Sequence, residues 1–181
     1  MPDAQPRENR DWRARLADLV RLSKEWEFPW KAYRPRPPSS RPWPKGLPAS
    51  ATLRDFYALC DGGPFSGLGS WLRLRELRTA AKNMAAQIEQ DRKELGDHVG
   101  PFVMGRDLVL ATDPDGFPLI WASETDLLVW YQPPVEGGSG WHPLHVALDE
   151  SLRRLFFPEP GATFAADEMW LEVIRRLEHL T

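Results

Sequence analysis

Residues 108–131 read LVLATDPDGFPLIWASETDLLVWY and consist of apolar runs separated by short polar segments. The apolar runs have the length and composition of β-strands, and they span Leu108–Ala111, Phe117–Ala122 and Leu127–Tyr131. The segments between them, Asp113–Gly116 and Ser123–Asp126, are rich in residue types that favour chain reversal. Because connections this short join antiparallel neighbours, the stretch predicts an antiparallel meander.

Further strands are expected on both sides of this meander. Ser70–Arg75 alternates leucine with arginine, as a strand with one solvated face does. Phe102–Met104 and Leu144–Ala147 are short apolar runs, and the second follows the glycine-rich segment Glu136–Gly140. The sequence therefore predicts a sheet of several short antiparallel strands.

Helical periodicity flanks the predicted sheet. A first helix over Asp11–Glu27 is indicated by one apolar stripe, formed by Trp12, Leu16, Leu19, Val20 and Trp26. Ser50 is placed to cap a short second helix, which the pair Gly62-Gly63 is expected to end. Later helices are expected over Leu77–Gly96, Asp149–Phe157 and Ala166–Leu180. These patterns predict an α+β fold, with an antiparallel β-sheet meander flanked by helices in a single domain.

The length of 181 residues suits one domain with additions. We expect four parts, which are an N-terminal segment and first helix over residues 1–28, a proline-rich basic linker over 29–48, an α+β core over 49–157, and a C-terminal helix packed on the core over 158–181.

The linker contains the segment Arg34–Pro48, which holds six prolines and four basic residues but no acid. This composition favours an extended, polyproline-like conformation. We interpret the segment as a connector or as an arm that wraps the body of the protein. Two alternatives are a ligand for an aromatic groove and a nucleic-acid contact, the latter through Arg34, Arg36, Arg41 and Lys45.

Hydrophobic residues make up 42% of the chain and charged residues 27%, which is typical of a globular protein. The first ten residues lack the apolar segment of a signal peptide, and no apolar run has the length of a membrane span. Cys60 is the single cysteine, so an internal disulfide is excluded. We therefore expect a cytoplasmic protein without a membrane partner.

Charge is unevenly distributed along the chain. Residues 1–106 carry 19 Lys or Arg and 13 Asp or Glu, whereas residues 107–152 carry eight acids and no Lys or Arg. Such an asymmetry can steer a basic partner toward one face, although a folded chain can also interleave these charges with those of the basic half. The acids that we expect at the edge of the predicted hairpins are Asp113, Asp115, Glu124, Asp126 and Glu136.

The sequence contains no motif that argues for catalysis, a cofactor or a metal ion. His142 and His145 are close in sequence, but a three-residue offset in a predicted strand directs their side chains to opposite faces. A small enzyme with a site around these histidines and the hairpin acids is kept as an alternative.

Tryptophan is frequent, with nine residues. Trp12, Trp26, Trp121 and Trp170 lie on apolar stripes or in an apolar strand, where core packing explains them. Trp30, Trp43 and Trp141 stand beside prolines or glycines. An aromatic residue in such a place pins a loop onto the body or anchors a partner, and pinning is the favoured interpretation.

Two stretches resemble the SUKH superfamily, the Smi/Knr-like proteins. The first joins Leu47-Pro48 to Leu53–Gly63, a Leu-Pro pair followed by a short helix and Asp61-Gly62-Gly63. The second runs from Val109 to Leu119 and on through Trp130-Tyr131, and is similar to the central hairpin of that family. The proline-rich insertion before Leu47 departs from the family pattern.

The resemblance implies an α+β binding module that is not an enzyme. Bacterial members of the family are commonly immunity proteins that neutralise partner toxins, often nucleases, and fungal members regulate cell-wall synthesis. We therefore expect a protein that binds a basic protein partner, not nucleic acid, and that has no cofactor. The candidate contact residues are the five hairpin acids and Trp141.

Overall fold

The computed structural model describes residues 11–25, 34–65, 69–96, 102–112, 116–131 and 142–156, with the side chains of Glu25 and 153–156 left out. The helices are α1 (Trp12–Leu22), the 3-10 turn η2 (Ser23–Glu25), α2 (Ala51–Leu59), α3 (Leu77–Leu95) and α4 (Leu144–Phe156). The strands are β1 (Gly63–Phe65), β2 (Gly69–Trp71), β3 (Asp107–Thr112), β4 (Pro118–Ala122), β5 (Leu127–Trp130) and β6 (His142–Pro143). The predicted C-terminal helix lies outside the described residues, as do Trp26, Trp30 and Trp170.

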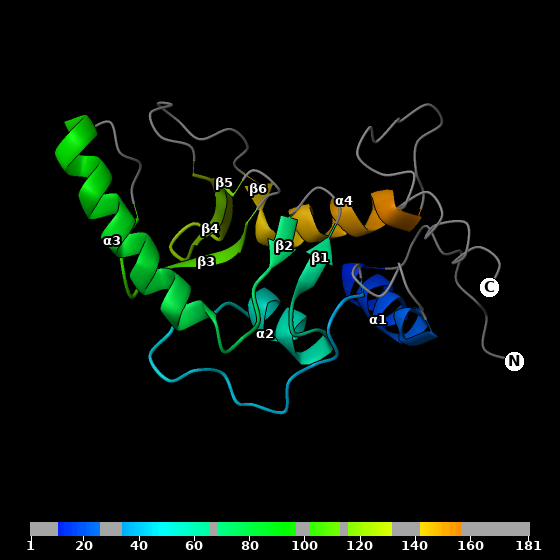
Figure 1. Cartoon of the computed structure of the whole chain (residues 1–181). Coiled ribbons are helices and arrows are strands. Elements are labelled where there is room, and N and C mark those ends of the chain that lie inside the picture. The colour runs from blue at the N-terminus through cyan, green and yellow to red at the C-terminus, as the bar shows by residue number, and fades with distance from the viewer. Residues whose placement is uncertain are drawn as a thin grey trace, which may run out of the picture.

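The six strands form one sheet in sequence order, and every pair of neighbours is antiparallel (Figure 1). The predicted α+β class and antiparallel meander are therefore confirmed. The meander covers the three runs expected from the sequence, with Trp121 opposite Leu108 on one side and Leu128 on the other.

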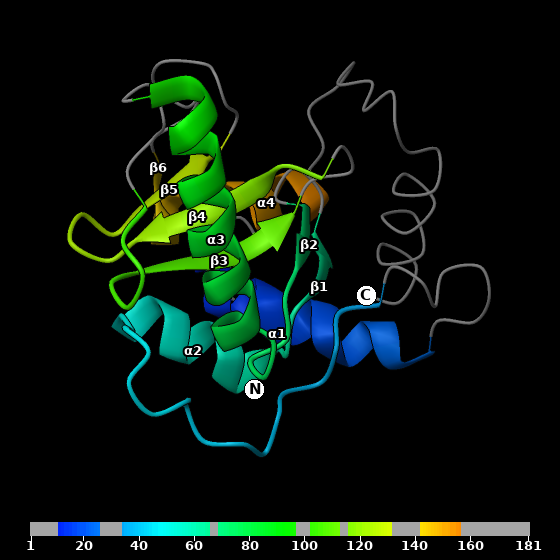
Figure 2. The same cartoon turned by 60° about the vertical axis from the view of Figure 1, so that its left-hand side comes forward.

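Helices cover both faces of the sheet, so its central strands bury side chains on each face. Leu108, Leu110 and Trp121 belong to the main core with α1, α2 and α4, whereas Val109 and Ile120 belong to a second cluster with α3. Figure 2 shows α3 crossing one face of the sheet while α1 and α4 lie on the other. Two-sided burial explains why these strands read as nearly continuous apolar runs.

The two N-terminal helices begin as the sequence predicts. Asp11 caps α1 by accepting a hydrogen bond from the Ala14 amide (3.1 Å), and Ser50 caps α2 by accepting one from the Leu53 amide (3.2 Å). The apolar stripe of α1 packs into the main core, with Trp12 buried.

The segment 34–48 is an arm bound to the body of the protein. Its backbone pairs with the segment before β1, where the Arg36 amide donates to Gly62 (2.9 Å) and Arg36 accepts from the Asp61 amide (3.0 Å). The Arg34 side chain donates to the carbonyls of Ser23 and Lys24. Of the two interpretations left open by the sequence, a connector and a wrapping arm, the structure shows an arm held against the body.

The motif Asp61-Gly62-Gly63 has a different role from the predicted helix stop. Helix α2 ends at Leu59, and Cys60 is already extended. Asp61 accepts a hydrogen bond from the Leu74 amide (2.8 Å), and a Cβ at Gly62 would lie 2.4 Å from the Leu72 carbonyl oxygen. The motif therefore allows the chain after α2 to approach the backbone that follows β2.

Three predicted strands differ from the structure. Leu144–Ala147 is the first turn of α4, which begins five residues before the predicted helix at Asp149. The buried positions Leu144, Ala147, Leu148 and Leu152 recur with helical spacing, and a four-residue apolar run fits either period. The strand predicted over Ser70–Arg75 is shortened to β2, and Phe102–Met104 contributes only an isolated bridge at Met104.

Candidate functional site

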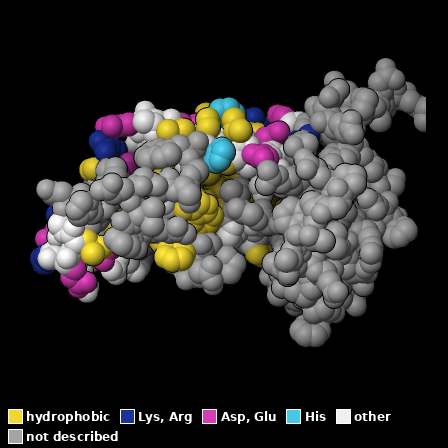
Figure 3. All heavy atoms as spheres, turned by 90° about the horizontal axis from the view of Figure 1, so that it is seen from above, with side chains coloured by type: hydrophobic (Ala, Val, Ile, Leu, Met, Phe, Trp, Pro, Cys, Tyr) yellow, Lys and Arg dark blue, Asp and Glu magenta, His cyan; other side chains and the backbone are white. Residues whose placement is uncertain are grey.

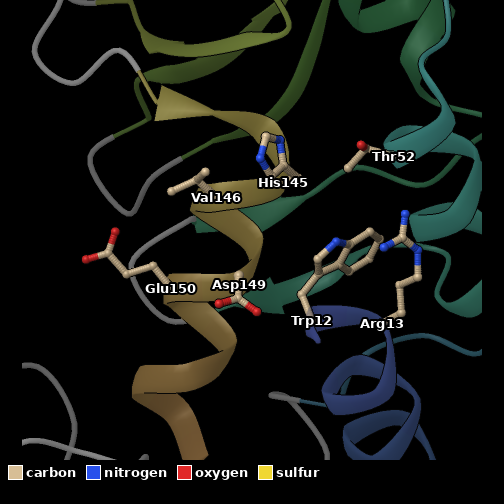
Figure 4. Close-up of a pocket in the computed structure, with 7 residues that line it drawn as sticks. All are labelled: Trp12, Arg13, Thr52, His145, Val146, Asp149 and Glu150. Carbon is tan, nitrogen blue, oxygen red and sulfur yellow. The ribbon is translucent and has the colours of Figure 1, made fainter. Parts of the chain in front are cut away.

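An open pocket lies where the N-terminal ends of α1, α2 and α4 meet. Its volume is about 620 Å³, and its lining residues are Trp12, Arg13, Thr52, His145, Val146, Asp149 and Glu150. Figure 4 shows Trp12, Arg13 and Thr52 approaching from one side and His145 and Asp149 of α4 from the other. The lining combines an indole and a valine with cationic, acidic and imidazole groups.

The α1 side of this pocket is held by two ion pairs. Arg15 is 5% exposed and donates to Asp149, whose side chain is 44% exposed, at 2.8 Å. Arg13 donates to Asp55 of α2 at 2.7 Å, and its guanidinium carbon lies 4.7 Å from the centre of the Trp12 ring. These pairs join α1 to α4 and to α2, so the relative placement of the three helices is fixed by charge as well as by packing.

Two of the predicted contact residues lie in the described turn between β4 and β5. The Glu124 side chain is 66% exposed and accepts a hydrogen bond from Arg106 at 2.7 Å. Asp126 has a φ of 55° and accepts from the Trp121 indole at 2.8 Å, and its carbonyl accepts from the Leu144 amide at 2.9 Å. Asp126 therefore ties the turn to β4 and to the start of α4.

The other predicted contact residues, Asp113, Asp115, Glu136 and Trp141, lie outside the described residues. The structure instead adds Asp149 and Glu150 of α4, the helix whose first residue donates to the Asp126 carbonyl. They follow Leu144 by five and six residues, which is about 8–9 Å along α4. We define the acidic face as Glu124, Asp126, Asp149 and Glu150.

The face seen from above in Figure 3 carries acidic, histidine and hydrophobic side chains close together. Val146 is 40% exposed beside His145, so an apolar side chain stands near the acidic groups of α4. Sequence reasoning missed the contribution of α1, because Arg15 and Asp149 are 134 residues apart and carry no local signal.

The two histidines are separated by a change of secondary structure. His142 is exposed in β6, and His145 is exposed in the first turn of α4. His145 lines the pocket, and His142 is not among its lining residues. Within the described ranges, no three His, Cys, Asp or Glu side chains gather closely enough to hold a metal ion.

Shifted pKa values occur at buried groups away from the pocket. Burial raises the pKa of the Cys60 thiol to about 12, and the thiol donates to the Gly62 carbonyl at 3.2 Å. Burial also raises the pKa of Tyr57 well above its ordinary value, with the nearby Asp61 carboxylate adding to the effect. Burial and the hydrogen bond to Asp91 raise the pKa of Tyr131. These groups stay protonated at neutral pH.

Comparisons of the chain with protein-family models, with curated proteins and with solved structures returned no match. Among the helices that the structure describes, none has the length and apolar character needed to cross a bilayer.

Proposed function

We propose that the chain is a non-catalytic protein-binding module of the SUKH type, acting as an immunity protein that binds a basic toxin such as a nuclease. The observation that carries the proposal is the acidic face, where the Asp126 carbonyl accepts from the first residue of α4 and where Asp149 and Glu150 of α4 line a pocket with the exposed Val146. An apolar centre with a charged rim is the usual composition of a protein interface. The resemblance of Leu47–Gly63 and of Val109–Tyr131 to the family supports the same proposal.

The net charge of the acidic face determines how this surface contributes to binding. Arg106 pairs with Glu124 and Arg15 pairs with Asp149, so part of the negative charge of this face is balanced within the fold. Exposed carboxylates such as Glu124, whose side chain is 66% exposed, attract a basic protein and raise its association rate more than its final affinity. The proposal keeps as further candidate contacts the residues that the sequence alone suggests, which are Asp113, Asp115, Glu136 and Trp141.

The test uses three versions of the full chain as bait in lysate of its own source. These are the unchanged chain, the variant Glu124→Lys/Glu150→Lys, and the control Glu89→Lys/Glu94→Lys, which reverses two exposed charges on α3. Asp126 is left unchanged because its side chain holds the Trp121 indole. The association rate of a captured protein is then measured by surface plasmon resonance from 50 mM to 500 mM salt.

The proposal expects one basic protein, bound in a fixed ratio to the unchanged chain and to the control and lost from the acidic-face variant. Its association rate should fall about tenfold across the salt range, since screening removes the attraction between exposed charges. A partner that binds all three baits equally, or whose association rate ignores salt, would refute recognition by the acidic face. Failure of every bait to retain a protein would refute the binding module itself.

A further inference from the structure

The arm brings cations of three separate segments together on the side of the molecule away from α4. Its residues Pro44–Leu47 form a turn, closed by the Leu47 amide donating to the Pro44 carbonyl at 3.2 Å. Arg78 in the first turn of α3 donates to the Lys45 carbonyl at the tip of this turn. Figures 1 and 2 show the arm passing beneath α2 and beside the lower end of α3.

Trp43 connects the arm to α2. Its indole donates to the Leu47 carbonyl at 3.2 Å, and its ring packs edge-on against Tyr57 with centroids 5.8 Å apart. The guanidinium carbon of Arg54 lies 5.9 Å from the ring centre. This contact confirms the expected pinning role of Trp43, and the indole stays partly exposed beside a cation.

We define the basic face as five exposed cations of the arm, α2 and the start of α3, namely Arg41, Lys45, Arg54, Arg78 and Lys82. Lys82 follows Arg78 by one helical turn, so the two lie on the same side of α3. Two of the four arm cations that the sequence suggested are left out because they are only partly exposed, whereas Arg78 is exposed although it donates to the Lys45 carbonyl. Arg34 holds the carbonyls of η2, and Arg36 donates to the Trp71 carbonyl at 3.3 Å.

The acids nearest to the basic face are held in structural contacts. Asp55 pairs with Arg13 at 2.7 Å, and Glu76 accepts from the Arg73 amide at 2.8 Å. Residues 34–96 as a whole contain 11 Lys or Arg and six Asp or Glu. The local charge is therefore positive, although the whole chain has a net charge of −3.

The composition of this face distinguishes between two kinds of anionic partner. A protein partner requires apolar anchors at the centre of the interface. The large hydrophobic side chains exposed within the described ranges are Val103, Met104 and Val146, and all three lie outside the arm, α2 and α3. Cations around a partly exposed indole match instead the phosphates and unpaired bases of a single strand.

We propose that the basic face binds single-stranded nucleic acid, with its cations on the phosphates and Trp43 against a base. This activity is separate from the protein binding proposed above. Contacts to about five phosphates give a slope of about −3.5 for the logarithm of affinity against the logarithm of salt concentration. The affinity then falls roughly a hundredfold between 50 mM and 200 mM salt.

The experiment measures fluorescence anisotropy of labelled 12-nucleotide single strands of DNA and RNA, with a duplex and poly-glutamate as competitors. The variant Lys45→Gln/Arg54→Gln/Lys82→Gln removes three cations of the basic face. The matched control Arg21→Gln/Arg92→Gln/Lys93→Gln removes three exposed cations elsewhere on α1 and α3. Thermal unfolding of both variants checks that the fold is kept.

We expect the control variant to bind a single strand like the unchanged chain. In the basic-face variant, the logarithm of affinity should fall against the logarithm of salt concentration with a slope of about −1.4, so the affinity should fall only about sevenfold between 50 mM and 200 mM salt. Equal slopes in the two variants would overturn the assignment to this face. Competition by poly-glutamate as strong as that by a single strand would overturn it in favour of an acidic protein partner. A duplex that binds as tightly as a single strand would overturn the role of Trp43. If a variant unfolds, the salt dependence of the unchanged chain still tests the proposal. A slope near zero for the logarithm of affinity against the logarithm of salt concentration would refute phosphate contact.

Discussion

Two glycines with nearly the same backbone conformation should respond very differently to alanine. Gly62 has a φ of +76° and Gly46 a φ of +79°, so each pays for a side chain in the left-handed region. A Cβ at Gly46 meets nothing within 4 Å, whereas a Cβ at Gly62 would lie 2.4 Å from the carbonyl oxygen of Leu72 and 2.6 Å from that of Trp71. To lengthen the 2.4 Å approach at Gly62 to an ordinary contact of about 3.4 Å, the backbone must shift by about 1 Å.

Gly46→Ala should lower the free energy of unfolding by about 1–2 kcal/mol, which is the cost of the left-handed conformation alone. Gly62→Ala should cost about 1–3 kcal/mol more, because the added methyl group forces β2 and the following turn to move. Urea unfolding, followed by tryptophan fluorescence, measures both values. Equal losses in the two variants would refute the idea that Asp61-Gly62-Gly63 is required for close backbone approach.

Three further outcomes are expected, two from buried groups and one from a helix cap. Tyr131→Phe removes a 2.7 Å hydrogen bond to the buried Asp91 carboxylate and should lower the free energy of unfolding by about 1.5–3 kcal/mol. Tyr57→Phe should lower it by only about 1 kcal/mol, because the Tyr57 hydroxyl donates to a neutral carbonyl. Because the pKa of Cys60 is raised from 9.0 to about 12, its contribution to stability is complete below pH 9 and is lost as the pH rises toward 12. Cys60→Ala should therefore flatten the first part of the alkaline loss of stability, and an unchanged pH profile would argue against this source. Ser50→Ala should cost about 1 kcal/mol in thermal or urea unfolding, through loss of the cap of α2.

Local pattern predicts the parts of this fold whose burial is regular over a long enough stretch. The 19 residues of α3 and the meander of β3, β4 and β5 were visible in the sequence because each repeats its period several times. The first turn of α4 was predicted as a strand because Leu144–Ala147 is too short to show a period. Only the pairing of β6 with β5 and the hydrogen bond from Leu144 to Asp126 show where the strand stops.

The candidate surfaces were less predictable, because they depend on contacts between distant segments. Glu124 and Asp126 look equivalent in sequence, yet one binds an arginine at the surface and the other holds the Trp121 indole. Likewise Arg34 and Lys45 are both arm cations, but the first is bonded to carbonyls of η2 and the second stands exposed at a turn. The residue type determines the charge. The contacts that the side chain makes in the folded protein determine whether that charge stabilises the fold or is available to a ligand.

The fold keeps part of the charge separation along the chain as a separation in space, although Arg15 and Arg106 of the basic half pair with Asp149 and Glu124. Figure 1 shows the arm below α2, with α4 and the β5–β6 edge above. Thr52 of α2 lines the pocket beside Asp149 and Glu150, whereas Arg54 lies about 200° further round the same helix. A helix is about 10 Å across, which exceeds the Debye length of about 8 Å in solvent at physiological salt. Exposed charges on one face are therefore largely screened from a ligand at the other. Lys45→Gln/Arg54→Gln/Lys82→Gln should leave capture of a basic protein unchanged, and Glu124→Lys/Glu150→Lys should leave the affinity for a single strand unchanged. An effect of either variant on the opposite face would mean that the two surfaces are coupled through the fold, because screened charge alone does not reach that far.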